Sequence, residues 1–524
     1  MISPEDMETY GYGHESIFLD LEQRILKDIV RRIKSTGVIT RSADFQLNQL
    51  KRIGYSDKDI KEMLTETLKL SNEYVDKLYT EAIKTDYIDN KSLYEATSTD
   101  FIPFEKNTLL QNNIKALKKI TNDEMKNLSR SLGFVVLEDE KTKAVKLTEY
   151  FQNVLDQIIV DVTAGAFDYN TTLRKAINAM TKSGVRWIDY ESGYHNRITV
   201  AARRAVISSI AQMSRTLSED TARRIGTNDY EVSAHANPRP THALWQGLVF
   251  TRQELVSVCG LGSVTGLGGA NCYHTYYPFV KGISVRAYTD EELEKMANST
   301  PKEWNSKEYT GYEAKQRMRQ MESNMRMYRE RIALLKEGDG NELDIMNAQI
   351  QYRSCMDEYV RFSKAMGMKQ QKERIYMDGL GKVGASGINT DNLTRKRNLM
   401  KGYQKAQKSG DISMLVEFQT YQRISDDIDK KIVGTTTKDG IMITGYKTHF
   451  IDRVIGQYES SDEPIKGKRK GVSIEMISNA LQNGELKERP LTKSGLRSIS
   501  YQTDECIVTI NPDTGELIQT TPRK

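Results

Sequence analysis

The sequence predicts a mainly α-helical protein with a glycine-rich α+β core and a separate small α+β domain near the C-terminal end. Apolar residues recur at helical spacing through most of the first part of the chain. From Tyr230 to Tyr288 this periodicity disappears, and glycine and aromatic residues become frequent. Short runs of β-forming residues follow near the end, two of them joined by the turn sequence Pro-Asp-Thr-Gly. A chain of 524 residues exceeds one ordinary core, so we expect several domains.

The composition is that of a polar globular protein. A hydrophobic content of 38% and a mean hydropathy of −0.59 are typical of long, solvated helices around modest cores. The net charge of +5 is too small to indicate nucleic-acid binding by itself. The four cysteines are widely spread and favour synthesis in a reducing compartment. No run of about 18 apolar residues occurs, so no membrane segment is expected.

The first predicted domain, residues 1–107, consists of short helices joined by tight turns. The segment 83–107 is less periodic and contains Pro103, so we expect a loop there. The predicted helices cover Ser16–Arg32, Phe45–Ile53 and Asp57–Ser71, with a further helix through Ala82.

The second predicted domain, residues 108–300, combines helices with the glycine-rich core. Residues 230–288 are expected to form loops and short strands. The predicted helices run from Thr108 to about Ser131 and over Thr148–Thr163, Asn170–Lys182, Ile198–Arg223 and Asp290–Ala297.

The third predicted domain, residues 301–377, is an antiparallel helical hairpin. Tyr309–Lys336 is expected to pair with Asn341–Ala365 across a Gly-Asp-Gly turn. Methionines at helical spacing along it predict a packing seam. The next segment, 378–440, carries clustered glycines and a basic patch, and is predicted to be a linker.

The last predicted domain, residues 441–524, is the small α+β domain. It is expected to contain a helix at Ser473–Gln482 and β runs at Leu496–Tyr501, Cys506–Asn511 and Leu517–Thr521.

Scarce metal-ligating side chains concentrate between Ser233 and His274. This segment holds three of the six histidines and two of the four cysteines. Zinc prefers thiolate and imidazole ligands, and Cys272-x-His274 places two of them on one local turn. Two interpretations stay open: a structural zinc site, or a loop-rich core in which histidines cap backbone groups and cysteines pack as small apolar residues. The candidate ligands are Cys259, Cys272, His274, His242 and His235.

The same segment carries a resemblance to a known family. His-x-x-x-Arg-Pro-x-His-x-x-Trp-Gln-Gly starts at His235, and Gly-Ala-Asn-Cys-x-His ends at His274. Together they resemble the signature of the phage minor capsid protein 2 family, which is related to Mu F-type head morphogenesis proteins. GVRWIDYESGYHNRITVAARRAV and EYTGYEAKQRMRQMESNMR are similar to regions on either side, so the resemblance spans about 15–375. It implies a non-enzymatic head component that partners phage portal and capsid proteins, made in the host cytoplasm and located in the virion near the portal.

The C-terminal domain carries a candidate catalytic pair. His449 and Arg453 are four residues apart, so on a helix they share one face. Cleavage of RNA by transesterification needs a base for the 2′-hydroxyl and cationic donors for the phosphorane, which histidine and arginine supply. An ordinary exposed pair has the same spacing. Further candidates are Lys493 or Tyr501 as general acid, and Ser500 and Thr520 as phosphate contacts.

A second resemblance supports this interpretation. Residues 448–453, GVSIEMISNALQNGELKERP and the β runs resemble the barnase–EndoU–colicin–RelE group of small metal-independent ribonucleases. The resemblance implies an RNA substrate and no cofactor. A departure is the loop ESSDEPIKGKRK between Arg453 and Gly471, which compact members of that group lack.

Three functional hypotheses follow. In the first, the chain is a portal-associated minor capsid protein whose C-terminal domain is a toxin-like ribonuclease. In the second, it is purely structural, with an inactive or RNA-binding C-terminal domain. In the third, it is a cytoplasmic nucleic-acid-binding protein, which the small net charge disfavours.

Overall fold

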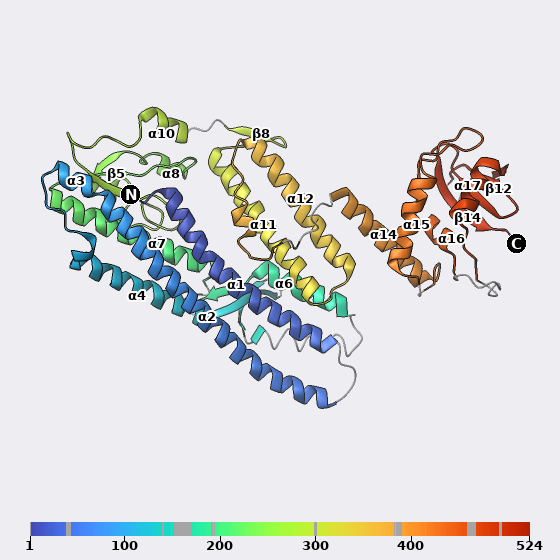
Figure 1. Cartoon of the computed structure of the whole chain (residues 1–524), viewed down its shortest axis with the longest axis horizontal. Coiled ribbons are helices and arrows are strands. Elements are labelled where there is room, and N and C mark those ends of the chain that lie inside the picture. Colours follow the sequence, from blue (N-terminus) through green and yellow to red (C-terminus); the bar gives the residue numbers. More distant parts are fainter. Residues whose placement is uncertain are drawn as a thin grey trace. The chain divides into compact units, whose positions relative to one another are not determined.

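The computed structural model divides the chain into two compact units, Met1–Ser386 and Gly387–Lys524 (Figure 1). The described residues are 2–37, 43–138, 141–147, 149–150, 169–189, 192, 194–297, 301–381, 383, 390–413, 416–457, 468–491 and 495–523. As predicted, the protein is mainly helical, with several small sheets and a separate sheet in the C-terminal unit.

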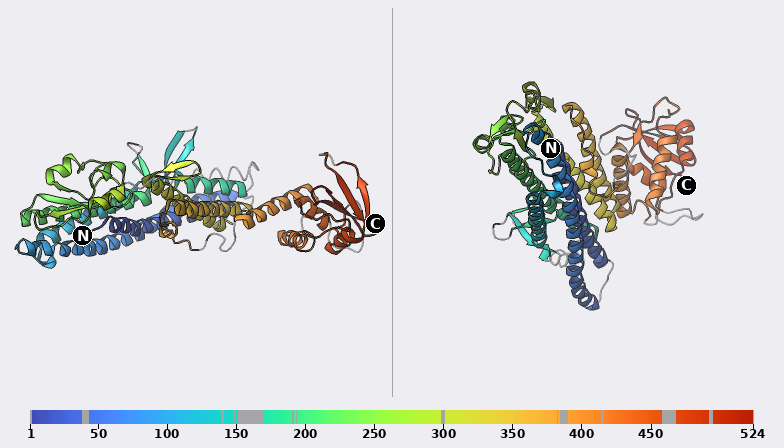
Figure 2. Two further views of the ribbon diagram at one scale, coloured as in Figure 1. Left: turned by 90° about the horizontal axis from the view of Figure 1, so that it is seen from above. Right: turned by 60° about the vertical axis from the view of Figure 1, so that its left-hand side comes forward.

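Long helices that run side by side build the first unit (Figures 1 and 2). Helix α1 contacts both α2 and α7, and α4 packs on α2 and α7. The start of α4 is set by Asn107, whose side chain accepts the Leu110 amide at 3.1 Å. Helix α7 ends at Gly226, which has a left-handed backbone with φ of 75°. These helices are α1 (Pro4–Gly37), α2 (Ala43–Asp89), α4 (Thr108–Arg130) and α7 (Ile198–Ile225).

Helix α2 corrects two predictions. The short helices predicted between Phe45 and Ala82 are one continuous helix, because packing against neighbouring helices outweighs the cost of about 1 kcal/mol for an internal glycine. The loop expected at 83–107 is also partly helical, with α2 extending to Asp89. Ile83 and Tyr87 are fully buried there, and this burial holds the last turns. The short helices α3 (Lys91–Ala96) and η1 (Phe104–Lys106) follow.

The described part of the first unit also contains three small sheets. The sequence did not predict the strands at 132–146, which form an antiparallel pair directly after α4. One sheet has the order β2-β1-β3-β4, a second has the order β6-β5-β7, and β8 pairs with β9. The strands are β1 (Leu132–Glu138), β2 (Lys141–Lys146), β3 (Arg186–Ile188), β4 (His195–Arg197), β5 (Asp229–Val232), β6 (Val249–Thr251), β7 (Tyr276–Phe279), β8 (Lys302–Trp304) and β9 (Lys307–Tyr309).

The remaining helices of this unit are α6 (Tyr169–Ser183), α8 (Pro240–Ala243), α9 (Arg252–Ser257), α10 (Asp290–Ala297), α11 (Gly311–Glu337), α12 (Glu342–Met366) and α13 (Glu373–Tyr376). Of these, α6, α10, α11 and α12 lie where the sequence predicted them, whereas the short helices α8, α9 and α13 were not predicted. The helix predicted at 148–163 lies mostly outside the described residues.

The predicted hairpin is α11 packed against α12 (Figure 1). Met318, Met321 and Met325 are buried along it and join the main apolar core, so the methionine stripe is a packing seam. This core also draws on α1, α4, α6 and α7, and therefore on all three segments predicted as domains within this unit.

The C-terminal unit is a five-stranded sheet with helices packed on it. The strand order is β10-β14-β13-β12-β11, in which β10 is parallel to β14 and the other pairs are antiparallel. Its elements are α14 (Thr390–Ser409), α15 (Phe418–Lys431), β10 (Gly445–Tyr446), α16 (Thr448–Ile455), α17 (Ile474–Asn483), β11 (Glu485–Arg489), β12 (Ser498–Gln502), β13 (Cys506–Ile510) and β14 (Glu516–Pro522).

The prediction that residues 378–440 form a linker is wrong. Helices α14 and α15 occupy most of it, and Leu399, Tyr421 and Ile428 are buried in the core of the C-terminal unit. Apolar residues at helical spacing are interrupted here by many charged ones, which hides the amphipathic pattern in the sequence. Among the described residues, none of the helices is long and apolar enough to cross a membrane.

Candidate functional site

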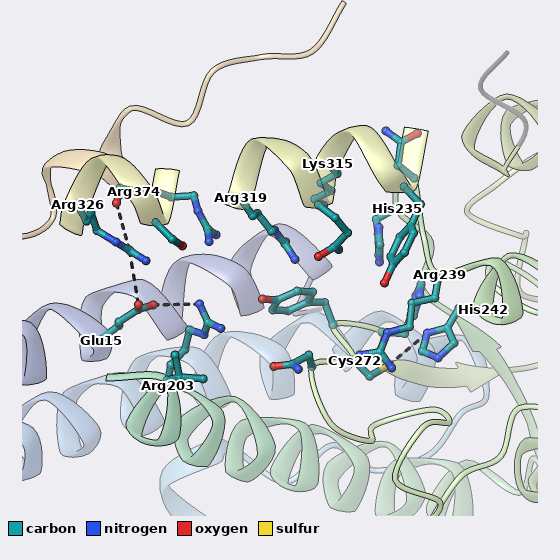
Figure 3. Close-up of a pocket in the computed structure, with 18 residues that line it drawn as sticks. Glu15, Arg203, His235, Arg239, His242, Cys272, Lys315, Arg319, Arg326 and Arg374 are labelled. Atoms are coloured by element: carbon teal, nitrogen blue, oxygen red, sulfur yellow. Dashed lines mark hydrogen bonds and ion pairs between the residues drawn. The ribbon is translucent and has the colours of Figure 1, made fainter. Parts of the chain in front are cut away.

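A pocket of about 310 Å³ lies in the first unit, at the segment Ser233–His274, called here the His/Cys segment (Figure 3). Helix α11 forms one wall, and Lys315, Arg319 and Arg326 project from it toward the pocket in Figure 3. A capping box sets the start of α11: Thr310 Oγ1 accepts the Glu313 amide, and Glu313 accepts the Thr310 amide at 2.9 Å. The charged lining comprises Glu15, Arg203, Arg239, Lys315, Arg319, Arg326 and Arg374.

Three imidazoles lie together at this pocket. The rings of His235 and His274 stack with centroids 4.6 Å apart and planes 18° apart, and His242 lies 5.4 Å from His274. Each ring bonds one backbone carbonyl at 2.9–3.0 Å. Because a carbonyl only accepts, the bonded nitrogen carries the proton. The bonds join His235 Nδ1 to Ala236, His242 Nε2 to Thr265 and His274 Nδ1 to Ser233.

Burial keeps these histidines neutral at pH 7. It lowers the pKa of His235 to about 4 and that of His274 to about 3, and it also lowers the pKa of His242. The second nitrogen of His274, Nε2, is buried and has no hydrogen-bond partner.

The predicted metal ligands come together only in part. Cys272 Sγ lies 4.0 Å from His242 Nδ1, but the rings of His235 and His274 stack in nearly parallel planes, and a metal ion cannot lie in both planes at once. Burial raises the pKa of the Cys259 thiol to about 12, whereas zinc binds the thiolate. Within the described part of the chain, no group of three or more such side chains is arranged to hold a metal ion. The residues as placed do not fit a zinc ion, and the zinc site stays a prediction.

In the C-terminal unit, α16 brings His449 and Arg453 together. Arg453 Nε donates to His449 Nε2 at 3.1 Å, and His449 Nδ1 lies 3.6 Å from Asp452 Oδ2. The buried Tyr421 hydroxyl donates to Asp452 at 2.8 Å. The opposite face of α16, with Phe450 and Ile451, fills the core and fixes the helix in place.

Three residues that the sequence analysis missed, Asp452, Arg469 and Asp411, complete this cluster. Arg469 donates to the backbone oxygens of Asp411 and Asp452 at 3.1 Å each. A hydrogen bond from Ser409, and then the nearby charges of Arg453, His449 and Arg469, lower the pKa of Asp411. Asp452 follows His449 by three residues, so helical spacing alone could have identified it. Asp411 and Arg469 came from segments expected to be a linker and a loop, and no sequence signal marked them.

Tyr501, Thr520 and Ser500, which were also predicted as catalytic, lie on the sheet of this unit. Tyr501 is fully buried and donates to Thr437 Oγ1 at 3.0 Å, and Thr520 donates to the Ile507 carbonyl at 3.1 Å. Ser500 alternates with Tyr501 along β12, so it lies on the opposite face of the sheet. Lys493 lies outside the described residues.

Comparison with known proteins identifies the first unit. The family model described as "Phage minor capsid protein 2" matches residues 2–361, which include α1 through most of α12 and the whole His/Cys segment. The helical body and its pocket are therefore those of a phage head component. The chain belongs to the phage minor capsid protein 2 family, which indicates a role in phage head morphogenesis, a location in the virion and virion proteins as partners. No curated protein and no solved structure matches this chain.

Proposed function

We propose that the protein is a portal-associated minor component of a phage head and that its C-terminal unit cleaves RNA without a metal ion. The family match supports the role in the phage head, and association with the portal goes beyond that match. The C-terminal unit lies beyond that match and has its own apolar core. The catalytic half therefore depends on its site alone.

The observation that carries the catalytic half is the arrangement of His449 between Arg453 and Asp452. Because Arg453 donates to His449 Nε2, a neutral imidazole carries its proton on Nδ1, on the side of Asp452. Nε2 is then the basic nitrogen. About half of the His449 side chain is exposed, so a substrate can reach it, whereas Asp452 is buried.

The chemistry is an in-line transesterification. The 2′-hydroxyl of RNA gives its proton to His449 Nε2, displacing the Arg453 hydrogen bond. The 2′-oxygen then bonds to phosphorus, and Arg453 stabilises the added negative charge of the phosphorane. The bond from phosphorus to the 5′-oxygen breaks, and that oxygen takes a proton from a donor such as Lys493. The products are a 2′,3′-cyclic phosphate and a 5′-hydroxyl.

Cleavage of total RNA by the full-length protein in EDTA tests this half. His449→Ala should lower the rate by about two to four orders of magnitude, and Arg453→Ala should cost about 3 kcal/mol of transition-state stabilisation. Arg497→Ala, which removes an exposed ion pair with Asp513 in the same unit, is the matched control and should cleave normally. Folded protein that leaves RNA intact would contradict the proposal. The second hypothesis, an RNA-binding or inactive unit, would then remain.

Mass spectrometry of purified virions, with cross-linking, tests the structural half. We expect this chain in the particles and cross-links between the first unit and the portal protein. Particles that contain the chain but give cross-links only to other head proteins would contradict the portal assignment.

A further inference from the structure

The pocket of the first unit carries an excess of positive charge. Among the described residues, six cationic side chains line it, from Arg203 of α7 and Arg239 of the His/Cys segment to Arg374 of α13, whereas Glu15 is the one carboxylate in that lining (Figure 3). These groups come from elements far apart in the sequence. No single motif produces the site, and the fold assembles it.

Nearby carboxylates balance only part of this charge. Glu15 pairs with Arg203 at 3.1 Å and with Arg326 at 3.6 Å. Glu8 pairs with Arg319 at 3.0 Å and with Arg374 at 3.3 Å. A further carboxylate, Glu322, lies 2.6 Å from Arg374, but burial raises its pKa to about 7, so it supplies only part of a negative charge at neutral pH.

Two of the cations have no carboxylate partner among the described contacts. Arg239 donates to the Ala270 carbonyl at 2.7 Å, and Lys315 has neither a hydrogen bond nor an ion pair there. Burial lowers the pKa of Lys315, an effect that the nearby charge of Glu8 opposes in part and that of Arg319 reinforces. A partly buried, unpaired ammonium group in a cavity is unfavourable unless an anion joins it.

Buried polar atoms in the same lining also lack partners. His274 is 2% exposed, and its Nε2 has no hydrogen-bond partner. The Nε atoms of Arg203 and Arg319 are likewise buried without one. Such atoms are rare in folded proteins and indicate a ligand or solvent at that place.

We propose that this pocket binds a small phosphate-class oxyanion, either inorganic phosphate or pyrophosphate or the phosphate group of a small phosphorylated molecule. Arginines that converge on a cavity match the geometry of phosphate oxygens, and Lys315 supplies a further charge. The volume of about 310 Å³ is at the lower end for small-molecule sites. The inference is independent of the ribonuclease proposal, because the site lies in the other unit.

Isothermal titration calorimetry of the full-length protein tests this inference. The ligands are pyrophosphate, inorganic phosphate, a nucleoside monophosphate and a single-stranded oligonucleotide, each compared with sodium chloride of equal ionic strength. Saturable binding of at least one small phosphate compound supports the proposal, and the tightest of the three identifies the source of the phosphate group. Binding no tighter than that of chloride overturns it. Binding of a single-stranded oligonucleotide with none of the three small compounds also overturns it and assigns the surface to nucleic acid.

Two variants separate binding from folding. Lys315→Met keeps the aliphatic stem and should weaken binding about 10-fold to 100-fold. Because it removes an unpaired charge, the unfolding temperature should stay the same or rise. Lys364→Met, at an exposed position of the neighbouring helix α12, is the matched control and should bind normally. Equal weakening in both variants, or unchanged binding in Lys315→Met, overturns the assignment to this pocket.

Discussion

Arg329 is a fully buried arginine whose partner lies beyond the helical hairpin. Its Nε and a terminal nitrogen bond the two carboxylate oxygens of Asp378 at 2.7 and 2.9 Å, and the guanidinium lies 4.7 Å from the centre of the Tyr376 ring. Both side chains are at most 3% exposed, so neither charge can turn to water if the other is lost. The pair fixes the segment after α13 to α11.

We expect Asp378→Ala to lower the free energy of unfolding by about 3 to 5 kcal/mol, because it leaves the Arg329 charge buried without a partner. Glu95→Ala, which breaks an exposed pair with Lys91, should cost less than about 1 kcal/mol. Denaturant titration of both variants against the parent protein measures the difference. Similar small losses in the two variants would show that Arg329 finds another partner.

His14 makes the stability of the first unit sensitive to acid. It is fully buried in α1, and its Nε2 bonds Ser71 Oγ at 2.8 Å. Burial lowers its pKa from 6.5 to about 4. The folded state therefore binds a proton on His14 less readily than the unfolded state does. The contribution of neutral His14 to folding stability is present in full above pH 6.5 and is lost as the pH falls through 4.

The loss amounts to about 3 kcal/mol at most, from about 1.4 kcal/mol for each pKa unit. In His14→Gln this contribution is absent, while the other buried histidines remain in both proteins. The parent protein should therefore lose more stability than His14→Gln between pH 7.5 and pH 4.5. Parallel stability curves for the two proteins over that range would show that His14 titrates normally.

At the scale of the elements, α11 depends on its first turn. The Thr310 hydroxyl and the Glu313 carboxylate bond each other's backbone amides and satisfy two donors that the helix leaves free. The same box begins α10, at Thr289 and Glu292, but α10 buries none of its residues. Identical local chemistry therefore supports two helices of very different importance for the core.

We expect Thr310→Ala to destabilise the first unit by about 1 kcal/mol. Thr289→Ala should instead fray the first turn of α10 and leave global unfolding nearly unchanged, because none of the residues of α10 is fully buried. Denaturant titration reports the global effect, and amide hydrogen exchange of 290–297 reports the local one. Equal global losses would mean that α10 packs more tightly than its exposure indicates.

The elements also show what could be predicted from the sequence. Helices α4, α6, α7, α11 and α12 lie within a few residues of their predicted positions, because each has a strong apolar stripe and clear end signals. The β1–β2 pair was missed, since Lys141–Lys146 alternates charged and small residues that resemble a solvated turn. Helix α2 was divided near Gly54, where propensity suggested an end, but the helix continues through this glycine.

The candidate sites likewise contain residues that local spacing predicts and residues that only the fold brings together. The adjacency of His449 and Arg453 follows from helical spacing, and the structure has it. Arg469 and Asp411 join them only through the fold of the C-terminal unit, at a range that periodicity cannot reach. The cationic pocket was missed for the same reason, since its arginines are ordinary surface candidates when each is considered alone.

At the scale of the whole molecule, the two units have separate apolar cores. The main core of the first unit consists of buried apolar residues between Phe18 and Ile375, and that of the second consists of buried apolar residues between Leu399 and Leu517. Because cooperativity depends on shared packing, we expect two unfolding transitions in calorimetry rather than one.

One substitution in each unit tests this directly. Asp378→Ala should lower only the transition of the first unit. Gly515→Ala should lower only that of the second, because Gly515 has φ of 73° and an added Cβ would lie 2.0 Å from the Met442 carbonyl oxygen. Limited proteolysis followed by mass spectrometry assigns each transition to its unit. If either substitution moved both transitions equally, the units would unfold together, and the ribonuclease proposal would then have to be tested for effects of the body on the site at His449.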